Sequence, residues 1–180
     1  MIELNHSTSN RREYSRVDAY IPLEFRLVPS EEYKLVKSRI SGDVTLADFN
    51  LMPPWENHPD MEYLDLLNKK LDTIIQMLAI QYEGFHSLSF KYVSMSGSGM
   101  KFSAQRHFSL GDLLEFKMML TMHQPAALYV YGEVIRVESQ TKCFFITVCF
   151  SMIEDTIRDK IIRFVFETER EMLRERRNTE

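Results

Sequence analysis

Residues 90–104 read FKYVSMSGSGMKFSA, two short runs of alternating apolar and polar residues around a turn of glycine and serine. Alternation with a period of two predicts β-strands that bury one face. Glycine in the turn, at positions 97 and 99, permits positive φ angles and close approach of a ligand to the backbone. The stretch therefore predicts two strands joined by a tight turn.

The same alternation continues through the second half of the chain. Five strand-like runs are separated by Gly, Ser, Asp, Pro and Gln positions: SLSFKYVSM, GMKFSA, DLLEFKMML, ALYVYGEVIRVE and KCFFITVCF. An earlier strand is expected over Ala19–Val28, with Pro22 indicating an edge position or the start of the strand. Short strands with tight turns predict an antiparallel barrel or sandwich. A final helix is expected from about Glu154, with an apolar face formed by Ile157, Ile161, Phe164 and Val165.

Two further helices are predicted before the strand-rich half. The first follows Pro29, with Ser30 as N-cap, Gly42 as its stop, and Tyr33, Val36 and Ile40 at helical spacing. The second, MEYLDLLNKKLDTIIQMLAIQYEG, ends at Gly84 and carries heptad positions Leu64, Leu67, Leu71, Ile74 and Leu78. This seam indicates either packing on the helix's own domain or self-association. Additional apolar residues beyond the seam favour self-association: Leu66, Ile75, Met77 and Ile80.

Composition limits the classes of protein to consider. A chain of 180 residues can bury one sizeable core, and 44% hydrophobic residues are typical of a folded protein. A net charge of -4 disfavours generic binding to DNA or RNA. The chain contains no apolar run approaching the roughly 18 residues of a membrane span, and its N-terminus lacks the pattern of a signal peptide. We therefore expect a cytoplasmic protein.

Sites for metal ions or covalent catalysis are not expected. The five histidines show no metal-ligand spacing. Cys143 and Cys149 are expected to be buried free thiols on one strand. The sequence also lacks the GxSxG order of a nucleophile elbow and the GxxxxGK[ST] order of a phosphate loop. The absence of these patterns indicates that the protein is not an enzyme and has no cofactor.

A second motif precedes the first strand: RREYSR supplies Arg11, Arg12 and Arg16. RRxxxR before a first strand, together with a later [DN]xSxxG turn, resembles the paired signature of the PilZ domain family. In SMSGSG the matching positions are Ser94, Ser96 and Gly99. The resemblance extends over residues 11–28 and about 87–167, and includes the strand entry LGDLLEFKM and the later strands.

The resemblance implies a mainly β fold, a six-stranded antiparallel barrel with a C-terminal helix, that binds cyclic di-GMP and relays the signal to an unidentified protein partner. The ligand-binding residues would be Arg11, Arg12, Arg16, Ser94, Ser96 and Gly99. The barrel would comprise residues 1–28 and 87–180. Residues 29–86 would form a helical insertion that mediates homo-oligomerisation through the helix around Leu64–Leu78.

Position 94 departs from the family pattern. Ser94 stands where the family has Asp or Asn, so the acceptor that reaches the N–H groups of guanine is shortened. A lost hydrogen bond of this kind costs about 1 to 3 kcal/mol. This departure leaves a second interpretation open, in which the chain is an interaction scaffold of the same fold that does not bind the nucleotide.

Restoring the family residue tests the role of position 94. If the pocket is otherwise intact, Ser94→Asn or Ser94→Asp should raise the affinity for cyclic di-GMP roughly tenfold, because one hydrogen bond is recovered. Asparagine is the safer variant, since aspartate adds a charge near the ligand phosphates. Parallel titrations of the three proteins provide the measurement, and unchanged or weaker binding by both variants would show that Ser94 does not face the nucleotide.

Overall fold

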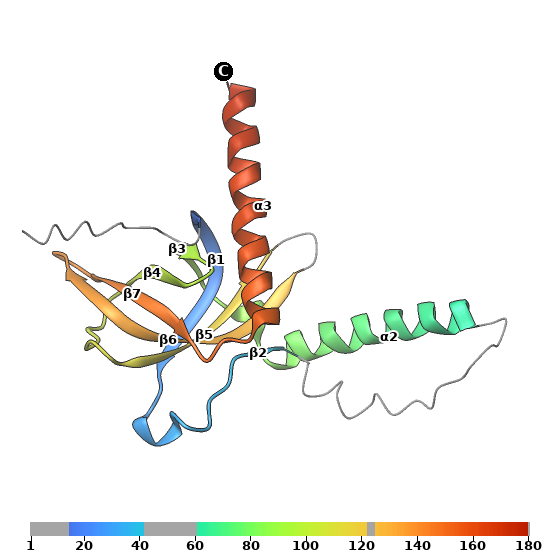
Figure 1. Cartoon of the computed structure of the whole chain (residues 1–180), viewed down its shortest axis with the longest axis horizontal. Helices are drawn as coiled ribbons and strands as arrows, with labels where there is room; N and C mark the ends of the chain where they lie inside the picture. Colours follow the sequence, from blue (N-terminus) through green and yellow to red (C-terminus); the bar gives the residue numbers. More distant parts are fainter. Residues whose placement is uncertain (1–14, 42–60, 122–124, 180) are drawn as a thin grey trace, which may run out of the picture.

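Seven strands form one antiparallel sheet, six of which close into a barrel (Figure 1). The computed structural model describes residues 15–41, 61–121 and 125–179. Along the sheet the strands follow the order β2-β6-β5-β1-β3-β4-β7, and pairing of β6 with β7 closes the ring. The strands are β1 (Arg16–Leu27), β2 (Arg39–Ile40), β3 (Phe90–Ser96), β4 (Gly99–Ala104), β5 (Leu113–Leu120), β6 (Ala126–Ser139) and β7 (Phe144–Ser151). The predicted six-stranded barrel is confirmed, and β2 adds to it outside the ring.

Alternating residues of the strands fill the barrel. In β5, Leu114, Phe116, Met118 and Leu120 are fully buried, while the residues between them are partly exposed. The C-terminal helix α3 (Asp155–Thr179) adds its predicted apolar face to the same core: Ile157, Ile161, Phe164 and Val165. Burial of each large apolar side chain is worth about 1.5 to 3 kcal/mol. The barrel and the first half of α3 are therefore one packed unit.

Strand β1 changes its partner at Pro22. From Arg16 to Pro22 it pairs with β3, and from Leu23 to Leu27 it pairs with β5. Proline has no N–H to donate, so it is tolerated where one side of a strand lacks a partner. The first half of β1 consequently has β3 on one side and leaves its other edge free of strand pairing.

The prediction of a helix after Pro29 is wrong. Ser30–Glu32 forms a single 3-10 turn with no side-chain cap, and Arg39–Ile40 is strand β2, which pairs with β6. Tyr33 and Val36, which were expected on a helical face, pack instead on Val28, Leu113 and Tyr131. The Tyr33 hydroxyl also accepts a hydrogen bond from the Leu113 N–H at 3.3 Å. Tertiary packing therefore outweighs a weak local preference for helix.

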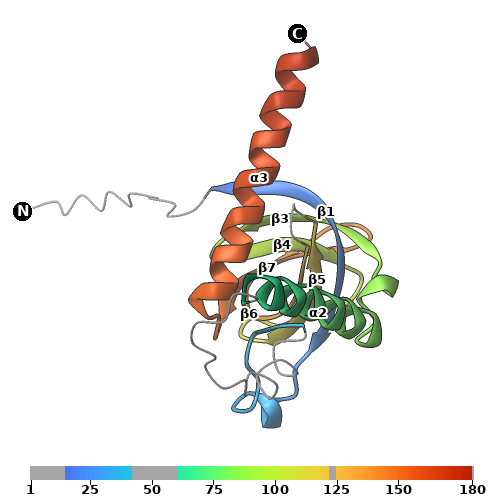
Figure 2. The same cartoon turned by 90° about the vertical axis from the view of Figure 1, so that its right-hand side faces the viewer.

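The long predicted helix is present as α2 (Met61–Tyr82) and extends away from the barrel (Figures 1 and 2). Gly84 follows it with φ 73°, the left-handed conformation that ends a helix and favours glycine. At this end Ile80 packs on a small cluster of Phe85, Leu88 and Ala127. The rest of α2 lies apart from the barrel, so its apolar seam is exposed in the single chain.

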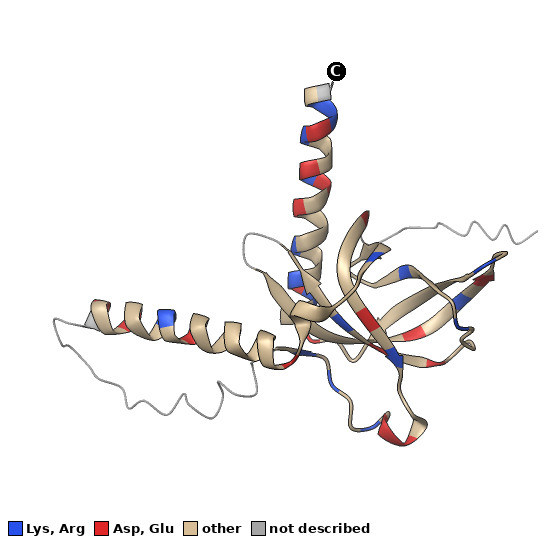
Figure 3. Cartoon of the chain, turned by 180° about the vertical axis from the view of Figure 1, so that it is seen from behind, with Lys and Arg blue, Asp and Glu red and all other residues tan. Residues whose placement is uncertain are grey.

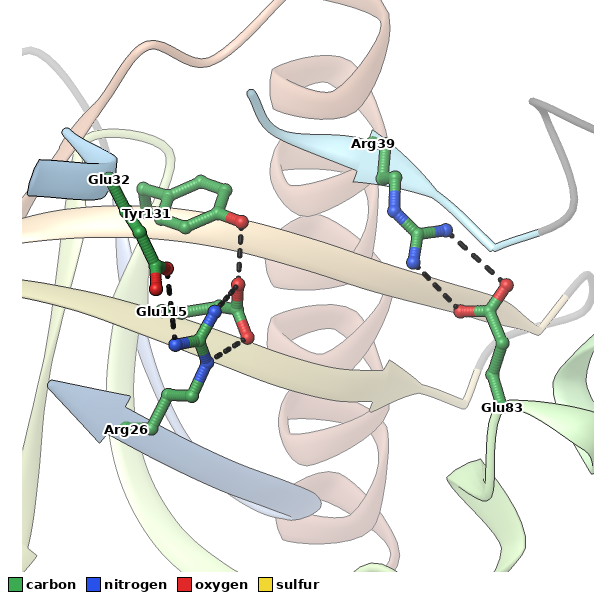
Figure 4. Close-up of polar contacts among 6 residues, drawn as sticks. All are labelled: Arg26, Glu32, Arg39, Glu83, Glu115 and Tyr131. Carbon is green, nitrogen blue, oxygen red and sulfur yellow. Dashed lines mark hydrogen bonds and ion pairs between the residues drawn. The ribbon is translucent and has the colours of Figure 1, made fainter. Parts of the chain in front are cut away.

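Arginine–carboxylate pairs anchor the insertion at its base (Figure 4). The guanidinium of Arg39, in β2, donates two hydrogen bonds of 3.3 and 3.2 Å to Glu83, directly after α2. Burial acts to raise the pKa of Glu83, but the bonds and charge of Arg39 outweigh it and lower that pKa. Lys117 of β5 also donates to the Glu83 carbonyl. Strand β2 and the residue after α2 are thus held side by side against the barrel.

The cysteine prediction is wrong about burial and about a shared strand, because β7 begins at Phe144, after Cys143. Cys143 and Cys149 are free thiols, as expected, but Cys143 is only partly buried and Cys149 is exposed. Cys149 lies on the outward face of β7, where its backbone pairs with Gly99 and Glu133. A pattern dominated by aromatic neighbours indicates a strand, but it does not reveal which face of the strand is buried.

Candidate site on the outer face of the barrel

The β1–β3 pairing brings the two sequence motifs together. Arg16 lies directly opposite Ser96, and Ser96 lies opposite Gly99 across the next hairpin. Ser94 is two positions back along β3 and faces Asp18. Arg11 and Arg12 lie outside the described residues. Of the predicted site, the structure thus brings together Arg16, Ser94, Ser96 and Gly99.

Ser96 is held within the turn. Its side chain is buried, and its hydroxyl lies 3.2 Å from the Ser98 hydroxyl and 3.2 Å from the Gly99 carbonyl oxygen, to which it donates. The Ser98 carbonyl in turn accepts a hydrogen bond from the Phe150 N–H at 2.9 Å. In this conformation Ser96 shapes the hairpin that borders the site.

Position 99 requires a glycine because the backbone of β7 lies too close for a side chain. A Cβ atom at position 99 would lie 2.1 Å from the Val148 carbonyl oxygen, a backbone atom that cannot move away independently. Gly99 itself lies in an extended strand, so the position needs space rather than a positive φ. The close approach expected here was that of a ligand, whereas in the structure the backbone of β7 occupies the space beside Gly99.

Comparison with known proteins supports the assignment made from the motifs. The PilZ domain model matches residues 78–167, which is half of the chain. The chain belongs to the PilZ domain family. The matched region runs from the end of α2 to the first half of α3. Strand β1 and the arginines of the RREYSR motif precede this region in the sequence. The β1–β3 pairing joins that strand to the PilZ barrel.

A solved structure shares this fold. It is a protein from Xanthomonas campestris described as a new tetrameric PilZ domain self-assembled via an unusual helical bundle. The match has a TM-score of 0.56 and 15% sequence identity, and it covers 89% of this chain and 91% of that one. No curated protein sequence matches this chain.

The structure adds residues that sequence reasoning did not single out. On the outer face of the PilZ barrel, Tyr20 of β1 stacks near Tyr92 and Phe90 of β3, with ring centroids 4.5 and 5.2 Å away. All three rings are exposed. Their contact depends on the register between β1 and β3, which neither strand's sequence reveals.

Helix α3 borders the same region. The Ser15 hydroxyl, immediately before Arg16, donates a 3.0 Å hydrogen bond to the Glu169 carboxylate. A cleft of about 380 Å³ lies between the unpaired edge of β1 and α3, and it is lined by Asp18–Ile21, Tyr92, Thr121, Phe164, Thr168 and Met172. The C-terminal helix therefore forms one wall beside the motif residues.

A second polar cluster lies on another part of the barrel and is internally satisfied (Figure 4). Arg26 donates hydrogen bonds of 2.8 and 3.0 Å to Glu115, which also accepts a 2.6 Å bond from the Tyr131 hydroxyl. Burial acts to raise the pKa of Glu115, yet Arg26 and Tyr131 outweigh it and lower that pKa. Burial and the same carboxylate raise the pKa of Tyr131. These contacts fasten β1, β5 and β6 and leave no free group for chemistry.

Residues 15–41, 61–121 and 125–179 contain no group of three His, Cys, Asp or Glu side chains placed to hold a metal ion. Within the same ranges, no helix has the length and apolarity needed to cross a bilayer.

Replacing Gly99 tests whether its role is structural. Gly99→Ala should lower the free energy of unfolding of the ligand-free protein by about 1 to 3 kcal/mol, because the added methyl group overpacks against Val148. Ser103→Ala, at an exposed position of the same strand, is the control and should change it by less than about 0.5 kcal/mol. Urea unfolding of the three proteins provides the measurement, and equal stabilities would contradict the steric role of Gly99.

Proposed function

We propose that this PilZ domain protein is a non-enzymatic receptor for cyclic di-GMP that relays the signal to a protein partner. The observation that carries the proposal is the β1–β3 register, in which Arg16 faces Ser96 and lies beside the Gly99 turn. Arg11 and Arg12 precede Arg16 by only a few residues. An arginine arm and a serine–glycine turn that are far apart in sequence can therefore approach one ligand.

The charge of Arg16 is available for a ligand. Arg16 is exposed and forms no ion pair or hydrogen bond with any other residue that the structure describes. Lys101, the neighbouring cation on β4, is instead paired with Glu138 at 2.6 Å. A guanidinium group binds phosphate oxygens bidentately, contacts O6 and N7 of guanine and stacks on purines. Such a group suits a ligand with two phosphates and two guanines.

Removing one arginine tests the receptor function. Arg12→Ala or Arg16→Ala should abolish detectable binding of cyclic di-GMP, because the arm supplies the positive charge of the proposed site. The melting temperature of the ligand-free protein should stay nearly unchanged. Arg106→Ala, an exposed arginine outside the site, is the matched control and should bind like the wild type.

Calorimetric titration of the wild-type protein distinguishes the receptor from a scaffold of the same fold that does not bind the nucleotide. A wild-type protein that gives no heat and no thermal shift at high micromolar ligand would contradict the receptor function. The interaction scaffold that does not bind the nucleotide would then be the better description.

We further propose that residues 29–86 are an oligomerisation element inserted into the barrel formed by residues 1–28 and 87–180. The seam of α2 is exposed, with exposed fractions from 39% at Leu67 to 59% at Leu78. The second half of α2 carries no charged residue after Asp72, and Figure 3 shows this half of the helix without charged colours. The similar Xanthomonas protein is described as self-assembled through a helical bundle. A contiguous apolar surface of this kind marks an interaction site.

Charges placed in the seam test this assembly. Leu71→Glu together with Leu78→Glu should convert the protein to soluble monomers, since two carboxylates would be desolvated in a packed bundle. Thr73→Glu with Gln76→Glu adds the same charges on the other face of α2 and should leave the oligomer intact. Sedimentation at micromolar concentrations gives the masses, and a monomeric wild type would contradict the proposal.

A further inference from the structure

Asp18 lies where the guanine acceptor is missing from position 94. Asp18 of β1 and Ser94 of β3 are directly paired across the antiparallel ladder. Side chains at such positions share one face of the sheet, with Cβ atoms about 4.5 to 5.5 Å apart. Asp18 is exposed, and its carboxylate has no ion pair or hydrogen bond with another described residue. The carboxylate is therefore next to Ser94 and free to accept hydrogen bonds.

We propose that Asp18 is the residue that recognises guanine in this protein, a role that rests on the proposed binding of cyclic di-GMP. The edge of guanine that carries N1–H and the N2 amino group presents adjacent donors, and an ionised carboxylate has two oxygens that accept them together. The Ser94 hydroxyl is shorter and offers a single oxygen. The acceptor that the family has on β3, at the position of Ser94, is thus supplied here by Asp18 at the facing position on β1.

The neighbours of Asp18 are arranged in an order that suits a nucleotide. Along the same outer face, the Arg16–Ser96 pair precedes the Asp18–Ser94 pair, and the Tyr20–Tyr92 pair follows it. Successive pairs are about 6.6 to 6.8 Å apart along the strands. A cation for phosphate is followed by an acceptor for the base edge and then by exposed aromatic faces for the base plane. Each part of a guanosine phosphate meets a group of matching chemistry.

The cleft beside α3 supports the same placement. Asp18, Tyr20 and Tyr92 all line it, and the opposite wall is formed by Phe164, Thr168 and Met172. This wall is largely apolar, so a base bound there would be partly shielded from water. Hydrogen bonds between a carboxylate and the base gain strength as water is excluded.

The direction in which affinity changes when the Asp18 carboxylate is removed distinguishes recognition of guanine from mere proximity to the ligand. A carboxylate that only lies near the ligand repels its phosphates, so its removal should tighten binding. A carboxylate that accepts the guanine donors should, when removed, weaken binding. The two roles of Asp18 therefore predict opposite changes in affinity for the same substitution.

The test compares Asp18→Ala with the wild type in calorimetric titrations with cyclic di-GMP and with cyclic di-AMP, whose adenine lacks the two adjacent donors. Asp18→Ala should weaken the binding of cyclic di-GMP about tenfold or more, and should leave any binding of cyclic di-AMP unchanged or tighter. Glu24→Ala is the matched control, because Glu24 is an exposed carboxylate on the same face of β1, about 20 Å along the strand. It should bind both nucleotides like the wild type.

A second substitution tests the facing pair directly. Ser94→Asn should restore roughly tenfold affinity in the Asp18→Ala background, since it returns an acceptor to the other side of the pair. In the wild-type protein, where Asp18 fills that role, the same change should raise affinity by less than the roughly tenfold gain expected from the family pattern alone. Asp18→Ser, which shortens the side chain but keeps it polar, should lose affinity like Asp18→Ala and serves if the alanine variant proves unstable.

The outcomes distinguish this inference from the receptor function. If the wild type binds cyclic di-GMP and Asp18→Ala binds it equally or more tightly, the role of Asp18 is wrong and the receptor function stands. If neither the wild type nor Ser94→Asn binds the nucleotide, both the receptor function and the role of Asp18 are wrong. Guanine-selective weakening in Asp18→Ala, with rescue by Ser94→Asn, supports both.

Discussion

The backbone pairing of β1 with β3 is the constraint on which the rest of the structure depends. These strands are separated in sequence by the whole inserted region, yet they pair from Arg16–Ser96 to Pro22–Phe90 without a register shift. A slip of one residue would turn Val17 and Ile21 out of the core and Arg16 into it. The buried face of β1 therefore fixes the position of Arg16 against the glycine turn.

Tolerance of the long insertion follows from the closeness of its two ends. The Leu23 N–H donates to the Ser89 carbonyl at 2.9 Å, so the strand before the insertion touches the segment after it. The entropic cost of a longer loop grows only slowly with length, by about 0.6 kcal/mol for each doubling. Pairing of β2 with β6 and the Lys117 bond to the Glu83 carbonyl then hold the base of the insertion on the barrel, and the Arg39–Glu83 pair joins β2 to the end of α2. The barrel can thus carry an additional helix with little change to its own packing.

The strands and the two long helices could be predicted from periodicity because each depends on a local pattern of buried residues. The segment after Pro29 could not, since Tyr33 and Val36 have helical spacing but pack on Val28, Leu113 and Tyr131 from distant parts of the chain. The same limit applies to the site. Ser94, Ser96 and Gly99 lie in a recognisable motif, whereas the role proposed for Asp18 depends on the strand it faces. The register between two strands that are far apart in sequence cannot be predicted from either strand alone.

Among the described residues, α2 meets the barrel at its C-terminal end, so the helix can act as a lever about that point. Its 22 residues form a rod about 33 Å long, because each helical residue rises about 1.5 Å. A rotation of about 10° at the base, where Ile80 and Glu83 meet the barrel, would displace the far end by about 6 Å, given this length. Small rearrangements among the base contacts are therefore magnified along the helix. Where several such rods are bundled, the angle set at each base also determines how far apart the barrels of neighbouring subunits stand.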